Sequence, residues 1–295
     1  MKAFRPEFWK ICLRIAALAV ILTAAFFGWC ALVNKLMFPS PRTGVRVGNI
    51  TLVSGGARLD ALWMPGLPDR EVILYSHGNC DRLDTIGGLL ERFGSRGYGV
   101  LAYDYAGYGG STGQAGEEQA YSDIEAAYRF LTEDQGIDPG RIVAVGYSIG
   151  SGPTSWLAEN RPVKAVVLVA PFASAAQVVL PFPIPGDHFP NADRLSRCRT
   201  PLLLFHGEAD RLIPVRNGEK IYRMASGRKR FLRVPGAGHV SIFSRLDSAL
   251  TDELEAFLAA LAGEGREHFR EARFPEADSV SDSRTECHIT KTPAQ

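Results

Sequence analysis

The chain has 295 residues, of which 46% are hydrophobic, and its formal net charge is +1. This length fits one large α/β domain or two small domains, and the apolar fraction is ordinary for a packed core. The near-neutral charge, without a dense Lys and Arg cluster, argues against a nucleic-acid partner. The five cysteines lack C-x-x-C spacing, so neither a disulfide framework nor a zinc site is predicted. The sequence leaves open whether Cys80 and Cys198 pair.

The N-terminal segment joins a basic start to an apolar run. Four basic residues and one acid lie in residues 1–14, and residues 15–33 are nineteen positions without a charge. A helix of that length nearly matches a hydrocarbon core about 30 Å thick. A cleaved signal peptide and a buried core helix are the alternatives, but no clear small-residue cleavage site precedes Asn34. We therefore expect residues 1–34 to form a single transmembrane anchor.

The basic residues before this run favour a cytoplasmic N-terminus, with the following domain on the opposite side of the membrane. Lys35, Arg42 and Arg46 follow the run closely, so the charge difference between the two flanks is small. We therefore expect a single-pass membrane protein in that orientation.

Beyond the anchor, short apolar runs alternate with longer amphipathic stretches. The expected strands cover residues 45–53, 58–64, 72–75, 100–103, 142–145, 165–169, 202–205 and 231–234. The expected helices cover residues 83–95, 117–133, 150–159, 215–225 and 243–261. This alternation predicts an α/β fold with a mostly parallel sheet and helices on both faces. In such sheets the functional residues follow the carboxyl ends of the strands.

The apolar run from Ile142 leads into the turn Gly146-Tyr147-Ser148-Ile149-Gly150, and a helix is expected after it. A strand, a G-x-S-x-G turn and a helix are the context in which a serine hydroxyl is exposed at the top of a sheet as a nucleophile. A second match, Gly109-Gly110-Ser111-Thr112-Gly113, lies in a Gly-rich loop without an immediate helix after it. We therefore predict that Ser148 is the nucleophile and that Ser111 belongs to a loop.

Three other strand ends carry candidate partners. Ser76-His77-Gly78-Asn79-Cys80 follows the strand at 72–75, where one oxyanion-hole amide is expected. We assign the two amides to Asn79 and Ile149, with Cys80 as the alternative to Asn79, and we expect His77 to shape the loop.

Asp210 follows the strand at 202–205 and is the candidate acid, with Glu208 as its competitor. His206 is expected to be structural. His239 stands in a Gly-rich loop after the last predicted strand, and it completes the chain order Ser, Asp, His.

The segment 170–200 is rich in proline and is expected to form a cap within a catalytic domain spanning 35–263. Its apolar residues either line an acyl pocket or pack the cap onto the core. They are Phe172, Val178, Val179, Leu180, Phe182, Ile184 and Phe189. Residues 264–295 are polar and are expected to be a disordered tail.

From about Asn34 to Leu261 the chain resembles the α/β-hydrolase fold serine hydrolases, in particular a membrane-associated subgroup that includes eukaryotic protein depalmitoylases. Several stretches carry the resemblance: residues 76–79, 103–109, 123–127, 146–150, 170–174, 189–191, 206–210 and 236–239. The resemblance implies an α/β-hydrolase fold and a Ser148, Asp210 and His239 triad. It also implies that the loop around Ser111 is not catalytic.

These observations predict a serine hydrolase that cleaves carboxylic esters or thioesters of acyl chains, through an acyl-enzyme and without a metal or an organic cofactor. The expected substrates include lipids and lipidated proteins. The alternatives are an amidase or peptidase that uses the same triad, and a catalytically silent binding or scaffold protein.

Overall fold

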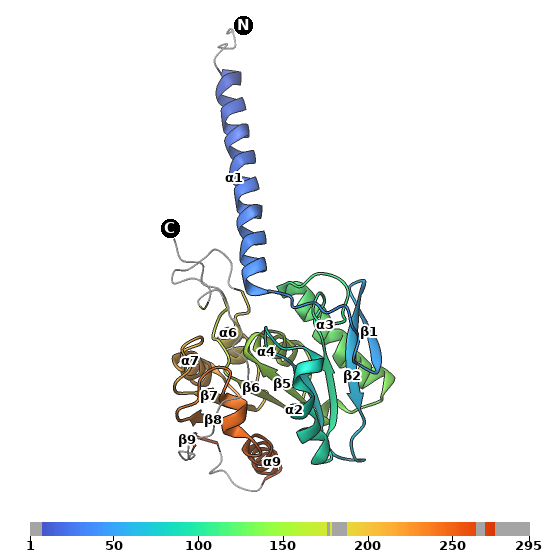
Figure 1. Cartoon of the computed structure of the whole chain (residues 1–295). Coiled ribbons are helices and arrows are strands. Elements are labelled where there is room, and N and C mark those ends of the chain that lie inside the picture. Colours follow the sequence, from blue (N-terminus) through green and yellow to red (C-terminus); the bar gives the residue numbers. More distant parts are fainter. Residues whose placement is uncertain (1–7, 176–177, 179–187, 264–268, 275–295) are drawn as a thin grey trace. The chain divides into compact units, whose positions relative to one another are not determined.

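The computed structural model describes residues 8–175, 178, 188–263 and 269–274 (Figure 1). The chain comprises two compact units, Met1–Pro39 and Ser40–Gln295. The first unit contains α1 (Phe8–Met37), which covers the apolar run. The second unit contains the sheet and all the candidate site residues.

The prediction of a transmembrane anchor, and with it a single-pass location, is wrong by the structure. Among the described residues, no helix is both long enough and apolar enough to cross a membrane. Lys10, Arg14 and Lys35 lie within α1, so the uncharged part is shorter than the helix itself. Helix propensity is a local preference, and it carries no information on whether the helix lies in a membrane. The apolar composition therefore predicted the helix correctly, but it did not establish that the helix crosses a membrane.

In the described part of Ser40–Gln295, nine strands form one sheet in the order β1-β2-β4-β3-β5-β6-β7-β8-β9. The strands are β1 (Ile50–Ser54), β2 (Ala57–Met64), β3 (Val72–Ser76), β4 (Gly99–Tyr103), β5 (Ile142–Tyr147), β6 (Ala165–Val169), β7 (Leu202–Gly207), β8 (Lys229–Val234) and β9 (Glu271–Arg273). β1 and β2 pair antiparallel, as do β2 and β4, and every other pair is parallel. The predicted mostly parallel sheet is confirmed.

Helices cover both faces of the sheet (Figure 1). They are α2 (Leu83–Ser95), α3 (Glu117–Arg129), α4 (Ser151–Asn160), α6 (Asn191–Arg197), α7 (Arg216–Met224), α8 (Ile242–Leu246) and α9 (Ala249–Leu261). Short turns join some of them to their neighbours: η1 (Phe130–Asp134), η2 (Pro139–Arg141) and η3 (Ser148–Gly150). The helix expected over 243–261 is two helices, because Asp247 adopts a φ of +40° between α8 and α9.

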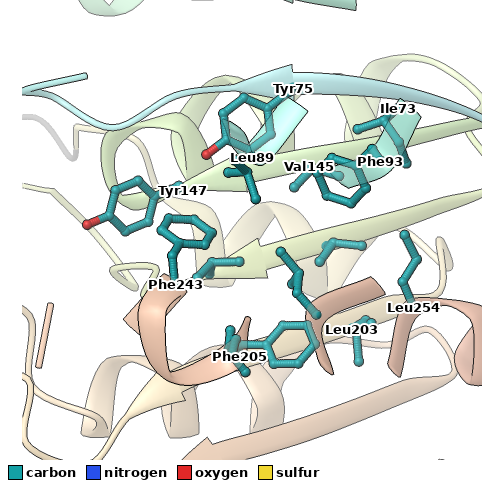
Figure 2. Packing of buried hydrophobic residues seen from close by; sticks show 14 of the residues in the cluster. Ile73, Tyr75, Leu89, Phe93, Val145, Tyr147, Leu203, Phe205, Phe243 and Leu254 are labelled. Carbon is teal, nitrogen blue, oxygen red and sulfur yellow. The ribbon is translucent and has the colours of Figure 1, made fainter. Parts of the chain in front are cut away.

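Alternate residues of β6 show how the core is divided. Ala165, Val167 and Val169 belong to a cluster with α2, α8 and α9, part of which Figure 2 shows. Val166 and Leu168 belong to a second cluster with α4, α6 and α7. Successive side chains of a strand point to opposite faces, so a continuous apolar run serves two cores. The continuous apolar pattern of the sequence therefore reflects burial on both faces.

The proposed cap lies partly outside the described residues. Val179, Leu180, Phe182 and Ile184 are among the positions that are not described. Phe172 and Phe189 are buried, and their ring centroids lie 6.2 Å apart. For these two residues the packing alternative holds. The segment also contains α6, which its proline-rich composition did not predict.

Part of the predicted tail belongs to the sheet. Residues 271–273 form β9, which pairs parallel with β8 at the sheet edge. Arg273 donates to Glu208 at 2.8 Å, and Arg233 of β8 donates to Glu219 of α7 at 2.9 Å. Residues 264–268 and 275–295 lie outside the described residues. A short polar edge strand has no apolar alternation, so its sequence resembles that of a coil.

Candidate active site

The turn after β5 holds Ser148 in a strained backbone conformation. Its φ is +52°, a region that non-glycine residues rarely adopt and that costs about 1–3 kcal/mol. The glycines on either side are required by close approaches. A Cβ on Gly146 would lie 2.5 Å from the carbonyl oxygen of Gly150, and one on Gly150 would lie 2.1 Å from that of Ser76. The G-x-S-x-G spacing is therefore a steric requirement of this turn.

A chain of hydrogen bonds joins Ser148 to two loops that are distant in sequence. His239 Nε2 lies 2.9 Å from Ser148 Oγ, and His239 Nδ1 lies 2.7 Å from Asp210 Oδ2. The side chain of Asp210 is fully buried, whereas that of His239 is 10% exposed. The structure thus brings together the three residues for which the sequence predicted catalytic roles. With the proton of the imidazole on Nδ1, Nε2 is free to accept the Ser148 proton.

Backbone amides fix the Asp210 carboxylate. Its Oδ1 accepts hydrogen bonds from the N–H groups of Leu212 and Ile213, at 2.9 and 2.8 Å. These bonds leave Oδ2 facing His239. The competitor Glu208 instead binds Arg273 of β9, so its carboxylate is directed to a different partner. The structure therefore favours Asp210 over Glu208.

His206 supports the Asp210 loop from inside the core. Its side chain is fully buried, and Nε2 lies 2.7 Å from the carbonyl oxygen of Ile213 and 3.6 Å from Asp210 Oδ2. Burial lowers the pKa of His206. A neutral ring with its proton on Nε2 donates to Ile213 without adding a charge beside Asp210. This arrangement agrees with the structural role that the sequence predicted.

The loop after β3 contains a tight turn at the position predicted for the oxyanion hole. The N–H of Asp81 donates to the Gly78 carbonyl at 3.1 Å, which places Asn79 and Cys80 at the two central positions. The Asn79 side chain accepts a hydrogen bond from the Tyr108 hydroxyl at 2.5 Å. Ile149 follows Ser148 in η3. The roles of the Asn79 and Ile149 amides remain proposals.

Comparison with known proteins identifies the family of this chain. Residues 68–186 match the family described as serine aminopeptidase, S33. The chain is 32% identical over 216 residues to α/β hydrolase domain-containing protein 17B of Xenopus tropicalis, covering 70% of this chain and 75% of that protein. It is 34% identical over 195 residues to the Homo sapiens protein 17B, covering 64% and 68% respectively. The chain belongs to the α/β hydrolase domain-containing 17 family.

Solved structures agree on the fold of this α/β hydrolase. An α/β hydrolase from Vibrio vulnificus matches with a TM-score of 0.59 and 21% identity, covering 70% of this chain and 79% of that chain. A Pyrococcus furiosus esterase matches with a TM-score of 0.61 and 17% identity, covering 73% and 98%. At these identities the matches show the fold alone. Family membership makes this protein a hydrolase of the serine hydrolase type.

Ser111 has a structural position in this α/β hydrolase. Its hydroxyl donates to the Asp104 carbonyl and accepts from the Asp60 N–H, both at 2.8 Å. The side chain is buried between these backbone groups. The Ser111 hydroxyl donates its proton to a backbone carbonyl, whereas that of Ser148 faces an imidazole nitrogen. The structure supports the prediction that Ser111 belongs to a loop.

His77 likewise shapes the loop of this hydrolase. Its ring packs 4.4 Å from that of Tyr105, whose hydroxyl donates to the His77 carbonyl at 2.8 Å. His77 Nε2 lies 3.4 Å from Asp104 Oδ1, and both side chains are buried. These contacts hold the start of the loop that carries Asn79.

Sequence reasoning missed two polar residues behind the nucleophile turn. Ser151 Oγ donates to the Ser148 carbonyl at 2.6 Å and accepts from Asn191 Nδ2 at 3.0 Å. Asn191 Nδ2 also donates to the Phe172 carbonyl at 3.0 Å. Asn191 lies in the segment assigned to a cap, so its only sequence signal was its place in a stretch that resembled the family.

The pairing of Cys80 with Cys198 does not occur, because Cys198 has a free thiol.

Within the described ranges, no cluster of three or more His, Cys, Asp and Glu side chains could hold a metal ion.

Proposed function

We propose that this hydrolase cleaves carboxylic esters or thioesters of acyl chains with Ser148 as nucleophile, His239 as general base and Asp210 as the residue that orients the histidine. The hydrogen-bonded arrangement in which His239 bridges Ser148 and Asp210 carries the proposal. Its three members follow the carboxyl ends of β5, β7 and β8, where parallel sheets place their sites.

In the first half-reaction, Ser148 Oγ attacks the acyl carbonyl carbon while His239 Nε2 removes its proton. The resulting imidazolium is stabilised by Asp210, which keeps its negative charge throughout. The tetrahedral intermediate then collapses, and His239 returns the proton to the leaving alcohol or thiol. The acyl group remains bonded to Ser148 Oγ.

In the second half-reaction, water attacks the acyl-enzyme. His239 accepts a proton from the water and then protonates Ser148 Oγ as the C–O bond breaks, which releases the carboxylic acid. The N–H groups of Asn79 and Ile149 are assigned to the oxyanion in both half-reactions. Each such donor contributes about 3 kcal/mol of transition-state stabilisation.

An amidase or peptidase is the second candidate, because the matching family over residues 68–186 is described as a serine aminopeptidase. The match ends before Asp210 and His239, so it does not include two of the three proposed catalytic residues. An amine is a poorer leaving group than an alcohol or a thiol, and its expulsion depends more on proton donation by His239. The two candidates therefore differ in leaving group and not in nucleophile.

A fluorophosphonate probe applied to the purified chain tests the nucleophile. We expect labelling of the wild type and of Ser111→Ala, and none of Ser148→Ala. Labelling that survives in Ser148→Ala would disprove the assignment, and the absence of wild-type labelling would favour a catalytically silent protein.

A substrate panel then separates the candidates: p-nitrophenyl esters of increasing acyl length, an S-acylated cysteine peptide as a model lipidated protein, and aminoacyl anilides. Ester or thioester turnover supports the first candidate. Turnover of the anilides alone would replace it with the second.

A further inference from the structure

Tyr147 contacts three parts of the proposed active site. It is the last residue of β5 and is paired with Val169 of β6, so the parallel ladder fixes its backbone directly before Ser148. The residue is 7% exposed. A Cβ on Gly78 would lie 2.6 Å from the Tyr147 ring, which shows that the ring packs against the loop carrying Asn79. The third contact is with His239.

The Tyr147 hydroxyl donates to the His239 carbonyl oxygen at 3.0 Å. The bond joins residues that are 92 positions apart. Neighbouring bonds hold the residues just before His239: Ala209 N–H donates to the Ala237 carbonyl at 3.0 Å, and Gly238 N–H donates to Ser241 Oγ at 2.9 Å. Among these bonds, the one from the Tyr147 hydroxyl reaches the backbone of His239 itself.

The ring of Tyr147 also supports the imidazole. The two ring centroids lie 5.4 Å apart with 27° between the planes. The rings of Phe243 and Tyr147 pack edge to face with centroids 4.8 Å apart. Both residues are labelled in Figure 2. An aromatic face backed in this way limits rotation of the imidazole, and its negative potential favours the imidazolium. Backbone and ring of His239 are therefore both held by one side chain.

We propose that Tyr147 is a positioning residue that keeps His239 within reach of Ser148, through its hydroxyl on the His239 backbone and its ring on the imidazole. This inference rests on the proposed function. If Tyr147 only filled the core, removal of its hydroxyl would change the stability of the protein and leave the catalytic rate unchanged. The hydroxyl therefore separates the two explanations.

The test compares Tyr147→Phe with Tyr128→Phe in the full chain. The Tyr128 hydroxyl donates to the Pro162 carbonyl at 3.0 Å, so the control removes the same kind of bond at the same distance, elsewhere in the fold. We expect Tyr147→Phe to lower both kcat and the rate of fluorophosphonate labelling about 3- to 10-fold, with KM within about twofold of the wild type. Tyr128→Phe should leave both rates unchanged.

A second variant, Tyr147→Leu, removes the ring as well as the hydroxyl. We expect kcat to fall about 100-fold, the effect of displacing a catalytic group by about 1 Å. If Tyr147→Leu does not fold, Tyr147→Phe still decides the matter because it keeps the packing. Tyr147→Phe with wild-type kcat and labelling rate would overturn the inference. A wild type that does not label would instead show that the proposed function fails, and the role of Tyr147 with it.

Discussion

Asn191 Nδ2 lies 3.0 Å from Ser151 Oγ, and this bond connects α6 to the first residue of α4, directly behind the nucleophile turn. Ser151 in turn donates to the Ser148 carbonyl at 2.6 Å. The segment assigned to the cap is therefore linked by hydrogen bonds to the strained residue at the centre of the site. Both side chains are fully buried, so the bonds are shielded from water.

Asn191→Ala should destabilise the protein by about 2–3 kcal/mol, because it removes two buried hydrogen bonds and leaves their acceptors unpaired. We also expect labelling of Ser148 to slow roughly fivefold, because the turn loses its support. Chemical unfolding and probe kinetics measure the two effects. Asn160→Ala is the control, since Asn160 makes one exposed bond to the Trp156 carbonyl. Equal stability of the two variants would contradict the prediction.

Asp210→Asn should lower kcat/KM about 1,000- to 10,000-fold, because a neutral amide neither holds the correct histidine tautomer nor stabilises the imidazolium. Glu208→Gln removes the competing carboxylate, whose partner is the exposed Arg273. We expect its activity to match the wild type and its stability to change by less than about 1 kcal/mol. Kinetics on an activated ester measure both variants. A large loss in Glu208→Gln with a small loss in Asp210→Asn would exchange their roles.

Gly150→Ala should prevent stable folding or cost at least about 3 kcal/mol, because its Cβ would lie 2.1 Å from the Ser76 carbonyl oxygen and backbone must move. Gly88→Ala is the matched control within α2, where a Cβ meets nothing within 4 Å. We expect it to stabilise the protein by about 0.5–1 kcal/mol, the usual helix preference of alanine over glycine. Thermal unfolding compares them. A Gly150→Ala protein as stable as the wild type would refute the steric explanation of the turn.

His206 should make the protein less stable as the pH falls. Burial lowers the pKa of His206 below its ordinary value of 6.5. Just below that pH the ring is therefore protonated in the unfolded chain while it remains neutral in the folded chain. Above pH 6.5 the ring is neutral in both states, and His206 does not lower the free energy of unfolding. Below pH 6.5 the free energy of unfolding decreases, and the decrease ends once the pH is below the folded-state pKa. Urea unfolding between pH 5 and 7.5 should show a steeper loss for the wild type than for His206→Gln, whose amide still donates to Ile213. Parallel slopes would exclude His206 as the cause.

Much of the fold followed from local pattern. The boundaries of α2 and, apart from α6, the order of strands and helices from β2 to β8 agree with expectation, because apolar runs and amphipathic stretches have different periods. β9 was not expected, because a three-residue polar strand at a sheet edge has no such pattern. The membrane span was predicted from an apolar run and is not supported among the described residues.

The sequence by itself determined which residue types stand at the strand ends, and in which order Ser148, Asp210 and His239 follow one another. It did so because a glycine-flanked turn and an apolar strand are each formed by adjacent residues, so both are visible as local patterns. Only the tertiary structure decided that Ser111 is enclosed by Asp60 and Asp104. It alone showed that the hydroxyl of Tyr147, the residue before Ser148, donates to the His239 carbonyl. Such contacts join positions far apart in the chain, and they depend on how the sheet and its loops pack, which no local pattern encodes.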